Sequence, residues 1–148
     1  IEVSESQEVR VVLKAQSRDT VEVQNIRKQL SKDPRSIALL NSLANEYVKN
    51  QDFAAAFAVF GRMQNIEPRN SSFKSSQGIL MIYMNNLEAA QENFQVAIKI
   101  NDHDRGALWG LAALSKKFEF QKNFAKFFTL AKSQGPLEGI THPWIKSL

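Results

Sequence analysis

Apolar residues recur every three or four positions along most of this chain, which is the spacing of amphipathic helices rather than of strands. Two such runs follow one another, the first with Leu40 and Tyr47 and the second with Ala56 and Phe60. Asp52 lies between them and is a predicted N-cap for the second helix, because its carboxylate can accept from a free backbone N–H. The pattern therefore predicts pairs of helices joined by short turns.

The helix pair repeats with a period of 34 residues. Pro34 and Pro68 are one period apart, and Asn86 stands one period after Asp52 as a second predicted N-cap. The same offset pairs further residues of like chemistry: Phe53 with Leu87, Ala55 with Ala89, Ala56 with Ala90, Phe60 with Phe94, and Ile66 with Ile100. Self-similarity at a fixed period of this length indicates stacked repeats, each of which buries its apolar face against its neighbours.

The 34-residue period, the two helices per period and the alanines at fixed places resemble the tetratricopeptide repeat (TPR). The resemblance implies an all-α fold, a right-handed superhelix of helix–turn–helix repeats. Ala44 and Gly78 on first helices are expected to face Ala56 and Ala90 on second helices, because only small side chains let the backbones approach. The repeat region at 34–134 is expected to hold three full repeats, at 37–70, 71–104 and 105–134.

The two ends and the last repeat depart from the regular pattern. Residues 1–33 keep part of the register and are expected to form an N-terminal helical cap or a degenerate repeat. The turn of the third repeat contains Phe118 and Phe120 in place of a small residue, so we expect a distorted repeat there. Residues 135–148 are expected to form a C-terminal capping tail, whose short helix from Pro143 covers the apolar face of the third repeat.

The resemblance implies that first helices line the concave side of the superhelix, where peptides usually bind. Positions at helical spacing along these helices give the predicted peptide-binding groove. Its residues are Asn41, Asn45, Lys49, Ser75, Ile79, Ile82, Tyr83, Trp109, Ala113, Lys116 and Lys117. Trp109 is expected to point outward, because its neighbour Leu108 takes the buried position. The alternative is that Trp109 and Tyr83 pack against each other or against the N-terminal helix.

Composition narrows the function classes. The chain has 148 residues, no cysteine and a formal net charge of +4. The absence of cysteine excludes disulfides, thiolate metal sites and a cysteine nucleophile. All of the positive excess lies in the last 44 residues, which carry seven basic and two acidic side chains. Such an end suits an acidic partner or serves solubility. No stretch has the ~20 apolar residues of a membrane span.

No motif for catalysis or for a cofactor is present, so we expect neither an enzyme nor a bound cofactor or metal. His103 and His142 have no partner at ligand spacing, and no glycine-rich phosphate loop or nucleophile elbow occurs. Base-reading helical repeats carry polar and basic residues throughout, whereas the first two repeats here are near neutral, so nucleic acid is not expected. The clamp that holds chaperone carboxylate tails in some TPR proteins keeps only Asn45 here.

The sequence therefore predicts a non-enzymatic scaffold that binds a protein or peptide segment in a concave groove. Among TPR proteins, a short array of this kind resembles the assembly factors of bacterial envelope complexes, such as those for pili, secretion systems or cytochrome c maturation. The alternatives are a self-association module that packs end to end as a homo-oligomer and, third, an RNA-binding repeat. A soluble domain in the cytoplasm or the periplasm fits equally well, as does a tether through a segment preceding Ile1.

Overall fold

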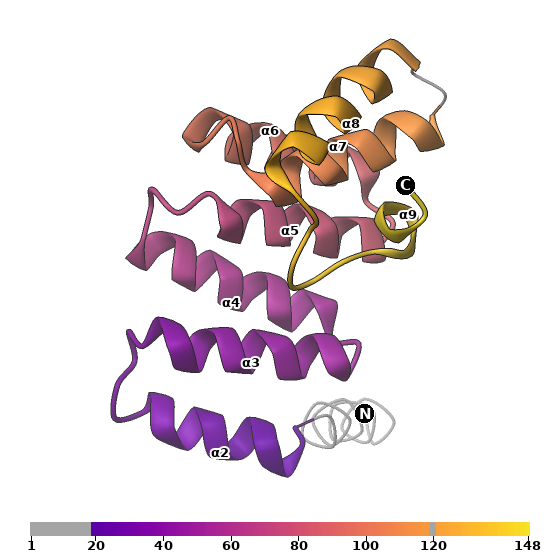
Figure 1. Cartoon of the computed structure of the whole chain (residues 1–148). Helices are drawn as coiled ribbons and strands as arrows, with labels where there is room; N and C mark the ends of the chain where they lie inside the picture. Colours follow the sequence, from indigo (N-terminus) through magenta and orange to yellow (C-terminus); the bar gives the residue numbers. More distant parts are fainter. Residues whose placement is uncertain (1–18, 119–120) are drawn as a thin grey trace, which may run out of the picture.

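The computed structural model describes residues 19–118 and 121–148, and all regular structure in these ranges is helical (Figure 1). The helices lie antiparallel in successive layers from the N-terminal to the C-terminal end. They are α2 (Val21–Leu30), α3 (Ile37–Lys49), α4 (Phe53–Ile66), α5 (Ser72–Tyr83), α6 (Leu87–Ile100), α7 (Arg105–Lys117), α8 (Gln121–Gln134) and the short α9 (Pro143–Lys146).

The turn inside each of the first two repeats has the same construction. The side chains of Asp52 and Asn86 accept from backbone N–H groups in the first turns of α4 and α6, at 3.3 and 3.2 Å. These contacts confirm the two predicted N-caps. The residues just before them, Gln51 and Asn85, have positive φ angles of 58° and 57°. The 34-residue period therefore holds in the backbone as well as in the sequence.

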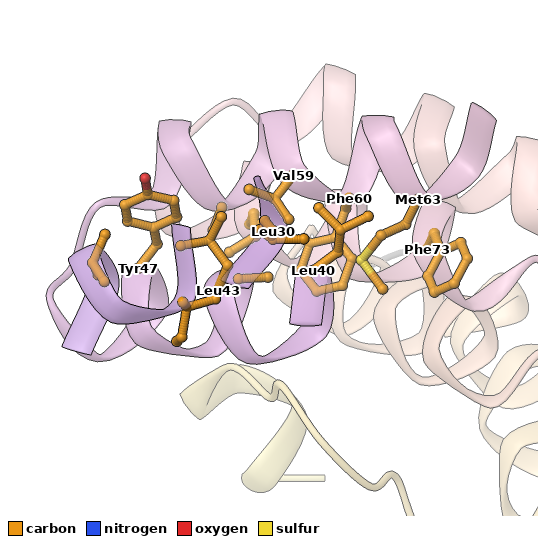
Figure 2. Packing of buried hydrophobic residues seen from close by; sticks show 13 residues of the cluster. Leu30, Leu40, Leu43, Tyr47, Val59, Phe60, Met63 and Phe73 are labelled. Carbon is orange, nitrogen blue, oxygen red and sulfur yellow. The ribbon is translucent and has the colours of Figure 1, made fainter. Parts of the chain in front are cut away.

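One buried cluster joins α2, α3, α4 and α5 (Figure 2). Leu40, Ala44 and Ala56 in its centre are completely buried, as the close approach of α3 to α4 requires. Phe60 extends the cluster to the next repeat, where its ring centroid lies 6.5 Å from that of Phe73. The second helix α4 thus contributes an aromatic side chain to the following layer.

Phe94 makes the equivalent contact between the second and third repeats. Its ring is fully buried between Gly78 of α5 and Gly110 of α7. A Cβ atom added at Gly78 would lie 2.5 Å from that ring, which is far inside van der Waals contact. The small residues in these first helices are therefore required by the aromatic residue that packs across both of them.

Two predicted features lie partly outside the described residues. The N-terminal cap at 1–33 is described only from residue 19, and there α2 packs against α3. In the third repeat α7 ends at Lys117 and α8 begins at Gln121, so the middle of the turn expected to distort that repeat lies outside the described residues.

The C-terminal tail, residues 135–148, was predicted to cover the apolar face of the third repeat. It turns back from α8 across α7 and α5 and ends in α9, which packs against α7 of that repeat (Figure 1). Its contact with α5 of the second repeat, where Tyr83 donates to the Thr141 carbonyl, was not predicted. Ile145 of α9 is buried together with Ile79, Ile82 and Ala113 of the first helices. Burial of its apolar residues thus takes the tail to the concave side of the stack.

Candidate functional site on the concave face

The part of the concave face formed by α3 is polar and open. Asn41, Asn45 and Lys49 are all exposed. Among the described residues, the side chains of Asn41 and Asn45 have no hydrogen-bond partner, whereas Lys49 Nζ donates to Glu46 Oε1 at 2.6 Å. The hydrogen bond and the charge of Glu46 raise the pKa of Lys49. Two amide side chains of this face are therefore free to bind a ligand.

The part formed by α5 and α7 is apolar and covered. Ile79, Ile82 and Ala113 are at most 3% exposed, and Ile145 of the tail packs in the same cluster. Ser75 is buried for a different reason, because it faces Gly106 of α7 at the contact between the two helices. The expectation that these predicted groove residues are open to a partner is wrong, since the chain's own tail and helix packing cover them.

The two aromatic residues of the predicted strip contact the tail as well. Tyr83 stacks on Phe53 with a centroid distance of 4.7 Å, and its hydroxyl donates to the Thr141 carbonyl at 2.5 Å. Trp109 is half-buried, and its Nε1–H donates to the Gly135 carbonyl at 3.0 Å. The ring of Trp109 packs edge-on against Phe128 of α8. Trp109 is therefore not free, and within the described residues the two aromatics contact the tail, Phe53 and Phe128 rather than each other. The predicted packing against the N-terminal helix involves residues that lie largely outside the described ranges.

The short helix α9 begins with a histidine cap. His142 Nδ1 accepts from the Trp144 backbone N–H at 3.2 Å, so this nitrogen must be unprotonated. The His142 ring packs edge-on against Tyr83 and against Trp144. Burial lowers the pKa of His142 from its ordinary value. Lys117 Nζ lies 5.2 Å from the Trp144 ring centroid, a cation–π distance. Lys116 is exposed and has no such contact with an aromatic ring of the described residues.

A cavity of about 490 Å³ lies where the polar and the covered parts meet. Its walls come from α3, the start of α5, the loop into α7 and the first half of the tail. They include Asn41, Asn45, Ser72, Ser76, Arg105 and Ile140. The cavity opens to solvent and combines amide and hydroxyl groups with a few apolar atoms. This mixture suits a peptide main chain better than a purely apolar ligand.

The described residues offer little for catalysis. No three His, Asp or Glu side chains within 19–118 and 121–148 gather closely enough to hold a metal ion. The most buried carboxylate, Asp104, is fully used in structure: it caps α7 through Ala107 N at 2.8 Å and accepts from Ser71 Oγ at 2.5 Å. None of the helices within the described ranges has the length and apolar character needed to cross a membrane.

The tail was not among the predicted site residues. The apolar residues of the tail indicate that it is buried on the repeats, but they do not indicate that it covers the predicted groove. The useful signal is Gly135 and Gly139, which both have positive φ angles, 91° and 86°. Such angles favour glycine and allow the sharp reversals that bring the chain back onto the stack.

No protein-family model matches the sequence, and no curated protein matches it. Solved structures of two TPR proteins do match its fold. A crystal structure of MamA aligns with a TM-score of 0.65 at 15% identity, over 76% of this chain and 66% of MamA. PilF from Pseudomonas aeruginosa aligns with a TM-score of 0.66 at 18% identity, over 78% of this chain and 53% of PilF.

A further MamA structure, MSR-1 C2, aligns with a TM-score of 0.60 at 15% identity, over 82% of this chain and 70% of that one. The chain thus spans about two thirds of the first MamA structure and about half of PilF. At these identities the likeness establishes the fold. The expected all-α helical-repeat architecture is confirmed.

Proposed function

We propose that this chain, with the fold of a TPR array, is a non-enzymatic scaffold that binds a peptide segment of a partner protein on its concave face. The contact begins in the open cavity, where Asn41 and Asn45 provide two free carboxamides. Each carboxamide can donate to a carbonyl and accept from an N–H of an extended main chain. A role in assembling a bacterial envelope complex is a further part of this proposal and rests on family resemblance alone.

The free carboxamides of Asn41 and Asn45 are the observation that supports the proposal most. An exposed Asn on a helix contributes little to folding, since water satisfies it equally well. Two of them at adjacent turns of α3, both lining a hollow of about 490 Å³, form a pair of donors and acceptors on one face of the helix. Side chains with that placement serve binding rather than stability.

Site-specific photo-cross-linking in cells of the source organism tests the proposal. A photoreactive amino acid at Asn45 should capture a discrete partner protein, and the same group at exposed Glu92 on α6 should not. An Asn41→Leu substitution beside the cross-linker should lower the yield, because it removes one hydrogen-bonding group. Identical products from both positions, or no product at Asn45, would contradict peptide binding on the concave face.

A further inference from the structure

The tail shows what the α5–α7 part of the concave face binds. Three side chains of this surface donate to the tail, and every acceptor is a main-chain carbonyl. Arg105 donates to Pro136, Trp109 to Gly135 and Tyr83 to Thr141, at 3.4, 3.0 and 2.5 Å. Any peptide offers such carbonyls. The donors therefore recognise a main chain without recognising its sequence.

Side-chain selectivity rests on two adjacent tail residues. Ile145 is the only buried residue of the tail, and it belongs to one buried cluster with Ile79, Ile82, Ala113 and Leu114. Trp144 lies beside it, half-buried, with Lys117 over its ring. The surface thus has one apolar pocket for an aliphatic side chain and a neighbouring cation for an aromatic ring.

The tail has few fully buried contacts with the rest of the chain. Its helix α9 has four residues, and the remaining apolar tail residues, such as Leu137, Ile140 and Leu148, are half-buried. Gly135 and Gly139 have open space around them, so the two reversals are not locked by packing. Segments with few buried contacts open locally at low free-energy cost while the rest of a protein stays folded.

We propose that the α5–α7 surface binds a partner segment with the tail's own chemistry: an aromatic residue followed by an aliphatic one, on a single helical turn. This deepens the proposed function and rests on it. The tail occupies the surface until such a segment replaces it. Ile145 and Trp144 mark the two positions that the partner segment must supply, and the main chain of that segment accepts from Tyr83 and Trp109.

The test uses the full chain and a fluorescent peptide with the sequence of residues 135–148 as the probe, so that it carries the carbonyls that accept from Trp109 and Tyr83. A tethered tail competes at an effective concentration of the order of millimolar, so the unmodified chain should bind the probe weakly. Ile145→Asp in the full chain should release the tail and tighten probe binding about 10-fold or more. Ser147→Asp is the matched control, because it adds the same charge at an exposed tail position and should leave binding unchanged.

A second variant covers the case in which Ile145→Asp disturbs folding. Gly139→Val strains the docked tail through its φ of 86° and leaves the binding surface untouched, so it should also tighten probe binding. A probe in which the residues equivalent to Trp144 and Ile145 are alanine should bind neither variant.

Helical, folded variants that bind the probe no better than the unmodified chain would overturn the proposal. Concentration-dependent dimers in light scattering, formed by exchange of tails, would overturn it as well, because the occupant would then be a second copy. If the variants fail to bind the probe but cross-linking at Asn45 still captures a partner, only this inference is contradicted. If the variants bind the probe but no partner is cross-linked, only the proposed function is contradicted.

Discussion

Equivalent positions in successive repeats have opposite chemistry on the concave face. Asn45, Ile79 and Ala113 are separated by 34 residues each and occupy the same place on α3, α5 and α7. Asn45 is exposed, whereas Ile79 and Ala113 are buried with the tail. The repeat therefore gives these three positions the same place in the backbone, whereas the type of side chain decides whether each position is buried or exposed.

This difference explains why the tail covers one part of the face and leaves the other open. Burial of apolar surface contributes about 25 cal/mol per Å², whereas an exposed Asn gains almost nothing when it is covered. The tail's Ile145 consequently packs with Ile79 and Ala113, and the polar α3 surface remains hydrated. The concave face of one stack of similar repeats thus has a half that the tail covers, on α5 and α7, and a half that is open to solvent, on α3.

The largest expected loss of stability comes from removing the buried aromatic ring that packs between α5 and α7, beneath the covered half. Phe94→Ala deletes the fully buried ring between Gly78 and Gly110, and such deletions cost about 3–5 kcal/mol. Urea unfolding followed by circular dichroism measures the loss. The matched change Phe57→Ala, at a half-buried position of α4, should cost clearly less. Equal losses at the two positions would contradict the role given to Phe94.

Overpacking should cost the same in both halves. Ala56→Leu and Ala90→Leu each add a branched side chain at a fully buried helix contact, for which about 1–3 kcal/mol is typical. The same unfolding measurement applies. Similar losses would show that the halves differ on their surface and not in their core, whereas full tolerance of both changes would contradict the close packing of the helix pairs.

Acid should weaken the covered half alone. The pKa of His142 is lowered from 6.5 when the tail is docked, so the docked state binds fewer protons than the released state. Docking is therefore strongest above pH 6.5 and weakens as the pH falls below that value. Amide exchange of residues 140–148 between pH 7.5 and 5, corrected for its intrinsic rate, measures this.

A His142→Asn variant is the control for this pH dependence. Its side-chain oxygen can still accept from the Trp144 N–H, but it has no proton to gain in this range. Tail protection should then be flat between pH 7.5 and 5. An unchanged pH dependence in His142→Asn would show that another group is responsible.

The smallest effect on stability should come from the open half. Asn41→Ala and Asn45→Ala remove exposed side chains without hydrogen-bond partners among the described residues, so each should change stability by less than about 0.5 kcal/mol. Thermal unfolding measures this, and partner capture at the concave face should fall in the same samples. A loss of several kcal/mol would mean that these side chains are structural.

Much of the fold follows from the sequence because its causes are local. The 34-residue period, the small residues and the caps at Asp52 and Asn86 predict the helix pairs, and the structure places α3–α4 and α5–α6 accordingly. Phe94 stands one period after Phe60 in the sequence, and like Phe60 it packs against the next repeat, where it lies against Gly110 of α7.

The site was harder to predict because it depends on contacts distant in sequence. The apolar residues Leu137, Ile140 and Ile145 indicate that the tail is buried on the third repeat, but they do not indicate that it also covers the strip around Ile79 in the second repeat. Hydrophobic burial is non-directional, so it cannot choose between the surfaces of the two repeats. The choice depends on the glycine reversals and on the donors of Tyr83 and Trp109, which no spacing pattern reveals.

Nuclear Overhauser effects from the Ile145 methyl groups test most directly whether the tail occupies the α5–α7 surface of the free chain. Methyl-labelled full-length chain should show cross-peaks from Ile145 to Ile79, Ile82 and Ala113, the neighbours with which it is buried. No cross-peak to the α3 half is expected. Random-coil shifts for residues 140–148 without these cross-peaks, in a chain whose repeats are folded, would contradict the account.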